Sequence, residues 1–475
     1  MRDVDGERMK HAGRVDSTCF RVMHFIYSIR CSTMNKPDIC NTESTHYWTI
    51  HDAIHGKVTY PGYVREIVDT PQFQRLRNLK QLGVSSNVFP CSTHTRFEHC
   101  LGVCFLAGKL LKILEKNSGV QISDIHRKCV MLAALLHDVG HGPFSHMWED
   151  FVHNGSDKDW THEKSSCDMA CQLFAANNIQ LSQEAYEHYY AEQLICALIT
   201  GNQEALRTLL TPDTMFLSEI IHNKKFKLDV DKWDYLLRDL FYLDGVVRIS
   251  TDFVRLFDNA RVIRGGDGVT HIAYRAADYS AVIELFEARA TLHIECYQHR
   301  TVLGLQRMIM DGLTLAEECG FKLKGAKMSE AHQSPQVYLY LDDSIVKLIE
   351  ISDSVKLLPA QQLLDRFHQH RKYRVVHVSS QPIDVESLNK LFATDEFFQL
   401  HKKIPYASEM APRNVPLYDD QGRLVENRTI VDSIISNLRN QGFFEQYLVY
   451  CKSTEPEIVS RARKYLESLP LEKQC

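Results

Sequence analysis

Four residues have the types that could hold one metal ion: His99, His137, Asp138 and Asp231. Two imidazoles and two carboxylates form a mixed nitrogen and oxygen ligand set, which suits zinc, iron or manganese. His137 and Asp138 are adjacent and directly follow the apolar run LAALL. Because burial of such a pair without partners is unfavourable, it needs a metal or a complete hydrogen-bond network. The set predicts a metal-dependent hydrolase.

Three further histidines follow the adjacent pair, namely His141, His146 and His162. Gly140 and Gly142 flank the first of them, and glycine lets the backbone leave a helix and approach a ligand closely. Histidine can donate a proton to a leaving oxygen or hold phosphate oxygens, whereas a metal activates water and polarises a phosphoryl group. A lone buried histidine is more often a hydrogen-bonded core residue. The whole set therefore carries the prediction of phosphoester hydrolysis.

Two polar stripes follow helical spacing, since residues four apart share one helix face. The first consists of Asp231, Tyr235 and Asp239, and the second of Arg289, His293 and Tyr297. The first stripe offers a metal carboxylate and groups that can hold a sugar. The second offers a cation, an imidazole and a phenol, as a polyphosphate or nucleoside requires. The alternative for the second stripe is a solvated helix face, and for the basic segment 69–83 it is an exposed surface.

The composition is that of an ordinary globular protein, with 44% hydrophobic and 24% charged residues in 475. This length predicts one large helical body with appendages or two domains. The net charge of −5 argues against a generally basic nucleic-acid coat protein. The sequence contains no apolar run of about 18 residues, so no membrane span is expected. The 14 irregularly spaced cysteines predict buried, reduced thiols in an intracellular protein.

Hydrophobic periodicity predicts a mainly α fold. Helices are expected over residues 64–83, 99–114, 129–137, 191–199, 228–243 and 279–309. Beyond about residue 320 the pattern changes, and the segments VYLYLDD and YRVVHVSS predict short strands. The expected organisation is a flexible lead over residues 1–45, a helical catalytic domain over 46–320 and a smaller α+β lobe over 321–475.

Several long motifs occur in a fixed order: DTPQFQRLR, STHTRFEHCLGV, LLHDVGHGPFSHMW, WTHE, DVDKWDYLLRD and LHIECYQHR. They resemble the catalytic core of the SAM-and-HD-domain deoxynucleoside triphosphate triphosphohydrolases of animals, a family of the HD superfamily. The similarity extends from about Trp48 to about Lys452, and no SAM domain is expected before it. The resemblance implies a helical HD core that cleaves a dNTP at the α-phosphate and releases deoxynucleoside and triphosphate.

The resemblance also implies roles for individual residues. The metal ligands would be His99, His137, Asp138 and Asp231, and the groups acting around the phosphates would be His141, His146, Glu149 and His162. Substrate contacts would be made by Gln81, Leu82, Arg96, Lys232, Tyr235, Asp239, Arg289, His293, Tyr297 and Gln298. Among these, His146 would donate the proton, Asp239 would bind the 3′-hydroxyl, and Tyr297 would stack on the deoxyribose and exclude a 2′-hydroxyl. Glu149 replaces an aspartate of the family.

Family members are activated by GTP or dGTP and a second dNTP, bound with Mg²⁺ between the subunits of a tetramer. The resemblance therefore implies a homo-oligomer, either a dimer or a nucleotide-dependent tetramer. Matching positions are Asp69, Gln74, Arg77, Val88, Phe89, Arg255, His299 and Arg300. In contrast, Trp48 and His51 replace a lysine and an asparagine, and Ala277 replaces a lysine. Each lost cation removes a charge-assisted bond to phosphate.

Two alternatives stay open. One is another HD phosphohydrolase that acts on monophosphates or cyclic nucleotides. The other is a catalytically weak paralogue that binds nucleotides or single-stranded nucleic acid, which Glu149 and the altered activator positions favour and the unbroken metal set opposes. By resemblance, the enzyme would lower dNTP pools through dGTP catabolism, contribute to antiviral defence and reside in the nucleus. Because the sequence has no Lys/Arg-rich import segment, the cytoplasm is the alternative location.

Overall fold

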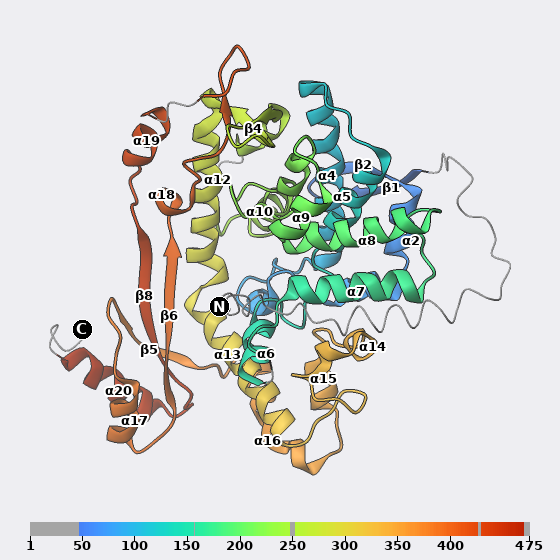
Figure 1. The fold of residues 1–475 in the computed structure, drawn as a ribbon. Coiled ribbons are helices and arrows are strands. Elements are labelled where there is room, and N and C mark those ends of the chain that lie inside the picture. The colour runs from blue at the N-terminus through green and yellow to red at the C-terminus, as the bar shows by residue number, and fades with distance from the viewer. Residues whose placement is uncertain (1–46, 156, 248–251, 426–428, 470–475) are drawn as a thin grey trace, which may run out of the picture. The chain divides into compact units, whose positions relative to one another are not determined.

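The computed structural model describes residues 47–155, 157–247, 252–425 and 429–469 (Figure 1). The predicted lead over residues 1–45 lies outside these ranges. The described residues are mainly helical, with small sheets of two and three strands. This confirms the predicted fold class, a helical core with a smaller C-terminal α+β lobe. The boundary at residue 320 stays a prediction.

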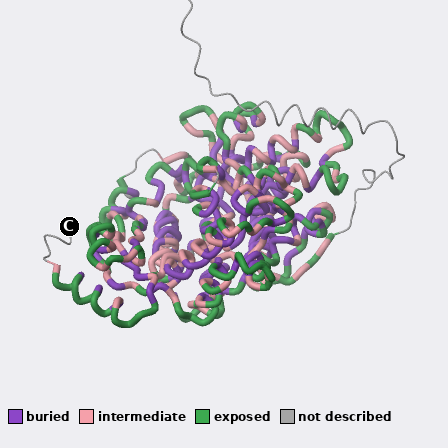
Figure 2. The backbone as a smooth tube through the Cα atoms, turned by 90° about the horizontal axis from the view of Figure 1, so that it is seen from below, coloured by how far each residue is buried: buried purple, intermediate pink, exposed green. Residues whose placement is uncertain are grey.

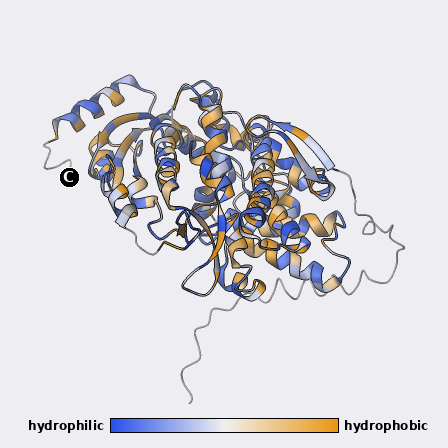
Figure 3. Ribbon diagram, turned by 90° about the horizontal axis from the view of Figure 1, so that it is seen from above, coloured by the Kyte–Doolittle hydropathy of each residue, from blue (hydrophilic) through white to orange (hydrophobic). Residues whose placement is uncertain are grey.

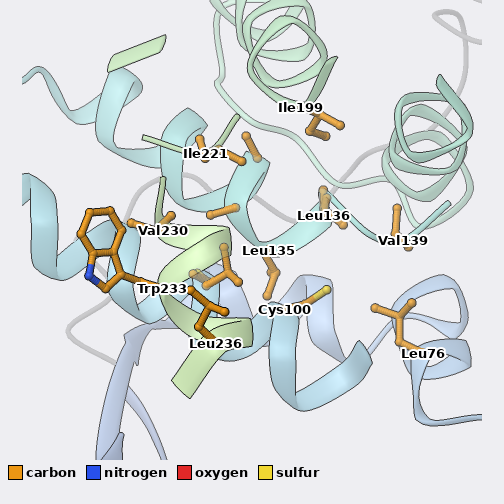
Figure 4. Packing of buried hydrophobic residues seen from close by; sticks show 14 of the residues in the cluster. Leu76, Cys100, Leu135, Leu136, Val139, Ile199, Ile221, Val230, Trp233 and Leu236 are labelled. Atoms are coloured by element: carbon orange, nitrogen blue, oxygen red, sulfur yellow. The ribbon is translucent and has the colours of Figure 1, made fainter. Parts of the chain in front are cut away.

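Three helices form the centre of the helical core: α4 (Arg96–Ser118), α5 (Asp124–Leu136) and α10 (Val230–Tyr242). A capping box between Thr95 and Glu98 begins α4, and Gly119 in the left-handed conformation ends it. The predicted helices over 99–114, 129–137 and 228–243 correspond to these three. Their apolar side chains pack together, and Figure 4 shows Cys100, Leu135 and Trp233 in this cluster.

Outer helices cover this centre. They are α6 (Met147–Gly155), α7 (His162–Ala176), α8 (Ala185–Thr200), α9 (Gln203–Leu209) and the 3₁₀ helix η3 (Met215–Glu219). Helix α8 corresponds to the helix predicted over 191–199 and packs on both α5 and α7. The buried parts of the tube in Figure 2 lie mostly inside, with exposed segments around them. Hydrophobic and hydrophilic residues alternate along the surface helices in Figure 3, as amphipathic helices require.

The prediction of one helix over residues 64–83 was wrong. The chain first forms a hairpin of β1 (Tyr47–Asp52) and β2 (Gly56–Pro61), followed by α2 (Gly62–Val68), α3 (Pro71–Gln74) and the 3₁₀ helices η1 (Arg75–Asn78) and η2 (Gly83–Asn87). Thr70 caps α3 and Pro71 occupies its first turn. Proline disfavours a helical conformation at the preceding residue, so α2 ends before it.

The helix predicted over residues 279–309 is also interrupted. It divides into α12 (Tyr279–Leu292), the π-helical turn η6 (His293–Tyr297) and α13 (Arg300–Glu318). His299 caps α13, where its side chain accepts a hydrogen bond from the Thr301 N–H. Before α12 the chain forms η4 (Asp252–Val254), α11 (Arg255–Asp258), β3 (Arg261–Arg264), β4 (Thr270–Arg275) and η5 (Ala276–Asp278).

The C-terminal lobe contains an antiparallel sheet in the order β5-β8-β6. Its strands are β5 (Arg374–Ser379), β6 (Phe397–Pro405) and β8 (Phe443–Cys451), and its helices include α17 (Val385–Phe392), α18 (Ala407–Met410), α19 (Thr429–Ser436) and α20 (Pro456–Ser468). The strand β7 (Leu417–Tyr418) instead pairs in parallel with β4. The strand predicted from YRVVHVSS is thus confirmed as β5.

The strand predicted from VYLYLDD was wrong. Between α13 and β5 lie η7 (Ala331–Gln333), α14 (Pro335–Tyr338), α15 (Ile345–Glu350), η8 (Val355–Leu357) and α16 (Leu358–His368). Pro335 at the first position of α14 starts a helix, which overrides the strand propensity of the following residues. Among the described residues, no helix combines the length and apolar character needed to cross a membrane.

Helices α4 and α10 pack tightly at Gly102, where an added methyl group would overlap the Asp234 carboxylate and the Arg238 guanidinium. We expect Gly102→Ala to lower the free energy of unfolding by about 1–3 kcal/mol, since both side chains are buried and must move. Chemical denaturation would measure this change. Gly266→Ala is the matched control because a methyl group there meets open space. An equal effect of both substitutions would contradict this account of the helix contact.

Candidate metal centre and active site

The structure brings together the four side chains predicted to hold a metal. His99 lies on α4, His137 and Asp138 directly follow α5, and Asp231 lies in the first turn of α10. His99 Nε2 is 3.1 Å from Asp231 Oδ1 and 3.7 Å from Asp138 Oδ2. His137 Nε2 is 3.4 Å from a carboxylate oxygen of each aspartate. Three helices thus direct two nitrogens and two carboxylates toward one small volume.

The two imidazoles are oriented as metal ligands require. His137 Nδ1 donates to the Ala134 carbonyl at 2.8 Å, which leaves Nε2 unprotonated in the neutral ring. This Nε2 atom is buried and has no hydrogen-bond partner among the described residues. His99 Nδ1 lies 2.8 Å from Asp234 Oδ2, so its Nε2 also faces the centre. A metal-bound histidine usually bonds a carboxylate or carbonyl through its other nitrogen. The residues therefore fit a divalent metal.

The carboxylates around His99 keep the centre negative. Burial lowers the pKa of His99, but the hydrogen bonds that the ring donates to Asp231 and Asp234 outweigh it and raise the pKa to about 10. Burial opposes ionisation of Asp138, yet the neighbouring Arg96 guanidinium holds its pKa well below the usual range. The nearby His137 and His99 imidazoles likewise hold the pKa of Asp231 below its usual range against the effect of burial. Ionised carboxylates beside a protonated imidazole favour exchange of that proton for a metal cation.

A buried network behind His99 was missed by sequence reasoning. Asp234 Oδ1 lies 2.6 Å from His55 Nε2, and Arg238 donates to both Asp234 oxygens at 2.9 and 3.0 Å. The same guanidinium bonds Asp52 at 3.0 Å. Asp234 is three residues after Asp231, on the face of α10 that is turned toward α4. Asp234 lies within the motif DVDKWD. Its position on the helix does not by itself distinguish a buried partner of His99 from a solvated carboxylate.

The imidazole rim (His141, His146 and His162) borders the centre. The rings of His141 and His162 stack with centroids 3.9 Å apart, and His146 meets His141 edge-on at 5.3 Å. Glu149 Oε1 is 3.0 Å from His162 Nδ1, and its other oxygen is 3.6 Å from His146 Nδ1. The side chain of His146 is 75% exposed, so a substrate can reach it. Glu149 therefore contacts both outer histidines of the rim.

The pKa values of two histidines of the rim and of the nearby His293 are shifted in different directions. Burial and the neighbouring Arg96 lower the pKa of His141 well below its ordinary value. Burial also lowers the pKa of His293, to about 3, with the Arg289 charge adding to the effect. For His162, burial acts in the same direction, but the hydrogen bond that the ring donates to Glu149 outweighs it and the pKa is raised. At neutral pH the rings of His141 and His293 are thus neutral, whereas the ring of His162 tends to be cationic.

The two predicted stripes meet at Asp239. The Tyr297 hydroxyl donates to Asp239 Oδ2, and His94 Nε2 lies 2.6 Å from Asp239 Oδ1. His94 also stacks on Tyr242 at 4.4 Å. Sequence reasoning missed His94, although it lies within the motif STHTRFEHC. Because Asp239 is held from both sides, its position is fixed before any ligand binds.

The other predicted substrate residues differ in their partners. Arg96 donates to Asp138 and, at 3.1 Å, to Ser145 Oγ, so in this structure it contacts a predicted metal ligand. Lys232 pairs with Asp229 at 3.2 Å. Among the described residues, Arg289 has no hydrogen-bond or ion-pair partner and lies electrostatically close to His293 and Tyr235. It is thus a cation available to an anionic ligand.

The rest of the predicted substrate set consists of Gln81, Leu82 and Gln298. Gln81 and Leu82 follow η1, and the Gln81 N–H donates to the His94 carbonyl at 3.0 Å. Its side-chain Oε1 is buried without a hydrogen-bond partner among the described residues. Gln298 Nε2 lies 3.4 Å from His293 Nδ1. These contacts connect Gln81 to the Asp239 side of the site and Gln298 to His293.

Residues 96–239, which include all four predicted metal ligands, match the HD domain family. The chain is 32% identical to the deoxynucleoside triphosphate triphosphohydrolase SAMHD1 of Bos taurus, over 88% of this chain and 77% of that protein. It is 33% identical to the Homo sapiens protein of the same name, over 88% and 72%. The chain belongs to the SAMHD1 family. A more distant relative is the putative HD domain-containing protein L394 of Acanthamoeba polyphaga mimivirus, with 28% identity over 62% of this chain.

The positions predicted to bind activators in this SAMHD1-family chain form two separate groups. Arg77 Nε donates to Gln74 Oε1 at 2.8 Å, and Gln74 in turn donates to the Val68 carbonyl beside Asp69. The residues predicted to read guanine therefore lie together where α2, α3 and η1 follow one another in the chain.

The second group of activator positions is divided within the chain. The Phe89 and His299 rings meet edge-on at 5.6 Å, next to Val88 and Arg300 in the sequence. Arg255 instead contacts Ser280 in the first turn of α12. Their roles stay predictions.

Removal of one metal ligand should abolish both metal binding and activity. We expect Asp138→Ala to lose the bound metal and to turn over substrate at least about 100-fold more slowly. Removal of one group that stabilises charge in the transition state causes a loss of roughly this size. Elemental analysis and a turnover assay would measure the two together. Asp420→Ala, which removes an exposed carboxylate bonded to Arg275, is the control and should keep both. Retention of the metal by Asp138→Ala would contradict the proposed ligand set.

Glu149 should control the protonation of His162. Glu149→Gln removes the negative charge that raises the pKa of His162, so that pKa should fall. At pH values below the pKa of the variant, His162 is protonated in both proteins, and above the wild-type pKa it is neutral in both. The charge of His162 therefore differs between the two proteins only in the pH range between these pKa values. NMR titration of ¹³C-labelled histidine would follow this ring. An unchanged pKa would show that the contact does not determine protonation.

Proposed function

We propose that the protein is a metal-dependent deoxynucleoside triphosphate triphosphohydrolase that releases deoxynucleoside and triphosphate. The observation that carries the proposal is the convergence of His99, His137, Asp138 and Asp231 on one volume beside the imidazole rim. The related proteins of cattle and human are named for this activity. The native metal would be zinc, iron or manganese, with Mg²⁺ accompanying the nucleotide.

In the reaction, water attacks the α-phosphorus, the bond from phosphorus to O5′ breaks, and O5′ takes up a proton. A metal held by the four ligands would act as a Lewis acid on the α-phosphate. His146 would donate the proton to O5′, since its ring is exposed and lies beside His141. His162 would favour phosphate oxygens, because Glu149 raises its pKa. Neutral His141 would add a hydrogen bond without an extra charge.

Recognition of the nucleotide would use the two stripes. Arg289, which has no protein partner among the described residues, would bind a phosphate, with neutral His293 beside it. Asp239 would accept a hydrogen bond from the 3′-hydroxyl. The Tyr297 hydroxyl is bonded to Asp239, which holds the ring in place, and this ring would stack on the deoxyribose and exclude a 2′-hydroxyl. This arrangement supports preference for deoxyribose over ribose.

Regulation forms a further part of the proposal. GTP or dGTP would bind near Asp69, Gln74 and Arg77, and a second dNTP near Phe89 and His299, in a homo-oligomer. Two features set this chain apart. The Trp48 ring lies tilted against Tyr60, with centroids 5.5 Å apart, where the family has a lysine, and the exposed Ala277 carries no charge. We propose weaker activation than in a protein with these cations. The cellular role would be control of dNTP pools, with antiviral restriction and a nuclear or cytoplasmic location.

The second candidate is a catalytically weak paralogue that binds nucleotides or single-stranded nucleic acid. Glu149 favours it, because the side chain is one methylene longer than the aspartate of the family and bonds His162 as well as approaching His146. The available phosphate-binding cation Arg289 and the four ligands would then serve binding alone.

Product analysis separates these functions. Metal-loaded protein with dGTP, with and without GTP, should release deoxyguanosine and intact triphosphate in equal amounts, as followed by chromatography and ³¹P NMR. The Asp138→Ala variant supplies the blank. Release of orthophosphate or pyrophosphate alone would exclude triphosphohydrolase activity, and nucleotide binding without any product would favour the weak paralogue.

A further inference from the structure

The loop of residues 139–146, which carries His141 and His146, has a strained backbone. Phe144 and Ser145 have φ angles of 58° and 62°. This left-handed conformation is unfavourable for residues with a side chain, by roughly 1–2 kcal/mol each. Neighbouring groups must therefore hold the loop in place, as is common where strain occurs beside an active site.

Asp343 supplies such a hold from outside the segment that matches the HD domain. Its Oδ1 accepts a hydrogen bond from the Phe144 N–H at 2.7 Å, and its Oδ2 accepts one from the Lys80 N–H at 3.0 Å. The Ser145 hydroxyl completes the connection by donating to the Lys80 carbonyl at 2.8 Å. One carboxylate thus joins the loop before His146 to the residue before Gln81.

Tyr338 and Leu341 help to fix the first half of the loop through hydrogen bonds to backbone carbonyls. The Tyr338 hydroxyl donates to the Gly140 carbonyl at 2.9 Å. Buried Arg75 donates to the carbonyls of His141 at 2.6 Å and Leu341 at 2.8 Å. Residues 338–343 therefore hold both halves of the loop, and Asp343 is the member of this segment that contacts the half bearing His146.

The surroundings of Asp343 keep its carboxylate available for both bonds. It borders a cavity of about 250 Å³ that is also lined by Lys80 and Phe144. Burial raises the pKa of Asp343 to about 6, so the group remains ionised at neutral pH. The preceding Asp342 has different partners, bonding the Asn78 amide at 2.9 Å and Ser344. The chain thus offers an adjacent carboxylate that does not contact the loop.

We propose that Asp343 is a positioning residue that fixes His146 relative to Gln81 and Leu82 by accepting backbone hydrogen bonds from Phe144 and Lys80. The inference rests on the proposed function, in which His146 donates a proton and the Gln81 loop contacts the nucleotide. Asp343 itself touches no substrate. A misplacement of about 1 Å at a catalytic group can lower a rate about 100-fold, which is the size of effect that this bridge can control.

Asp343→Asn tests the bridge because the amide has nearly the same shape but only one acceptor oxygen. One backbone N–H then faces the amide NH₂ group. We expect kcat to fall about 10- to 100-fold, with bound metal unchanged and KM changed less than about threefold. Asp342→Asn is the matched control and should keep kcat within about twofold. Equal kcat values for Asp343→Asn and the wild-type protein would overturn the proposal.

A double-mutant cycle distinguishes positioning from general stability. If Asp343 acts through His146, then Asp343→Asn should cause no further loss of kcat in a His146→Ala background. Multiplicative losses would overturn the proposal. Should Asp343→Asn not fold, Asp343→Ser, which keeps one acceptor in a smaller side chain, enters the same cycle.

Hydrogen exchange provides a measurement that does not need activity. In Asp343→Asn, backbone amides of residues 139–146 should exchange faster than in the wild-type protein, whereas Asp342→Asn should leave them unchanged. Unchanged exchange would overturn the bridge. If residues 139–146 exchange faster in Asp343→Asn but the wild-type protein releases no triphosphate, the bridge is supported and the proposed function is wrong.

Discussion

The hydrogen bond between His99 and Asp234 determines the arrangement of the metal centre. It fixes the ring of His99 so that Nε2 faces Asp138 and Asp231, and it joins α4 to α10. Asp234 can serve this role only because Arg238 balances its charge and because Gly102 leaves room for it. The proposed metal ligation, the helix packing and the compensation of a buried charge therefore depend on one contact. Partners of this kind commonly orient histidines that bind metals.

The support of the active site extends beyond the HD domain. The histidine-bearing loop is held by residues 338–343, and the π-helical turn η6 receives a hydrogen bond at 2.8 Å from Lys402 of β6 to the Ile294 carbonyl. Lys402 is almost fully buried, so this bond is shielded from water. The residues that would perform the proposed chemistry come mostly from the HD domain, α12 and η6. Their exact positions depend on residues 338–343 and on β6, which follow them in the chain.

Sequence reasoning predicted the helical class and the side chains that converge on the metal centre, because each of these side chains lies in a motif whose residue types indicate its chemistry. His137 and Asp138 are adjacent, and Asp231 and Asp239 share one helix face. It missed Asp234, His94 and Asp343, whose contacts connect residues 135, 145 and 199 positions apart. Such pairings arise only from tertiary packing. Local preference also failed at VYLYLDD, where helix initiation at Pro335 overrode strand propensity.

The π-helical turn makes the active site sensitive to chain length. A π-turn contains one residue more than an α-helical turn, and such insertions are frequent at functional sites. Deletion of a single residue between His293 and Tyr297 would restore regular α-helical winding and rotate the following side chains by about 100°. Tyr297 would then no longer face Asp239. Discrimination between deoxyribose and ribose would thus depend on a one-residue insertion in the backbone as well as on the side chain of Tyr297.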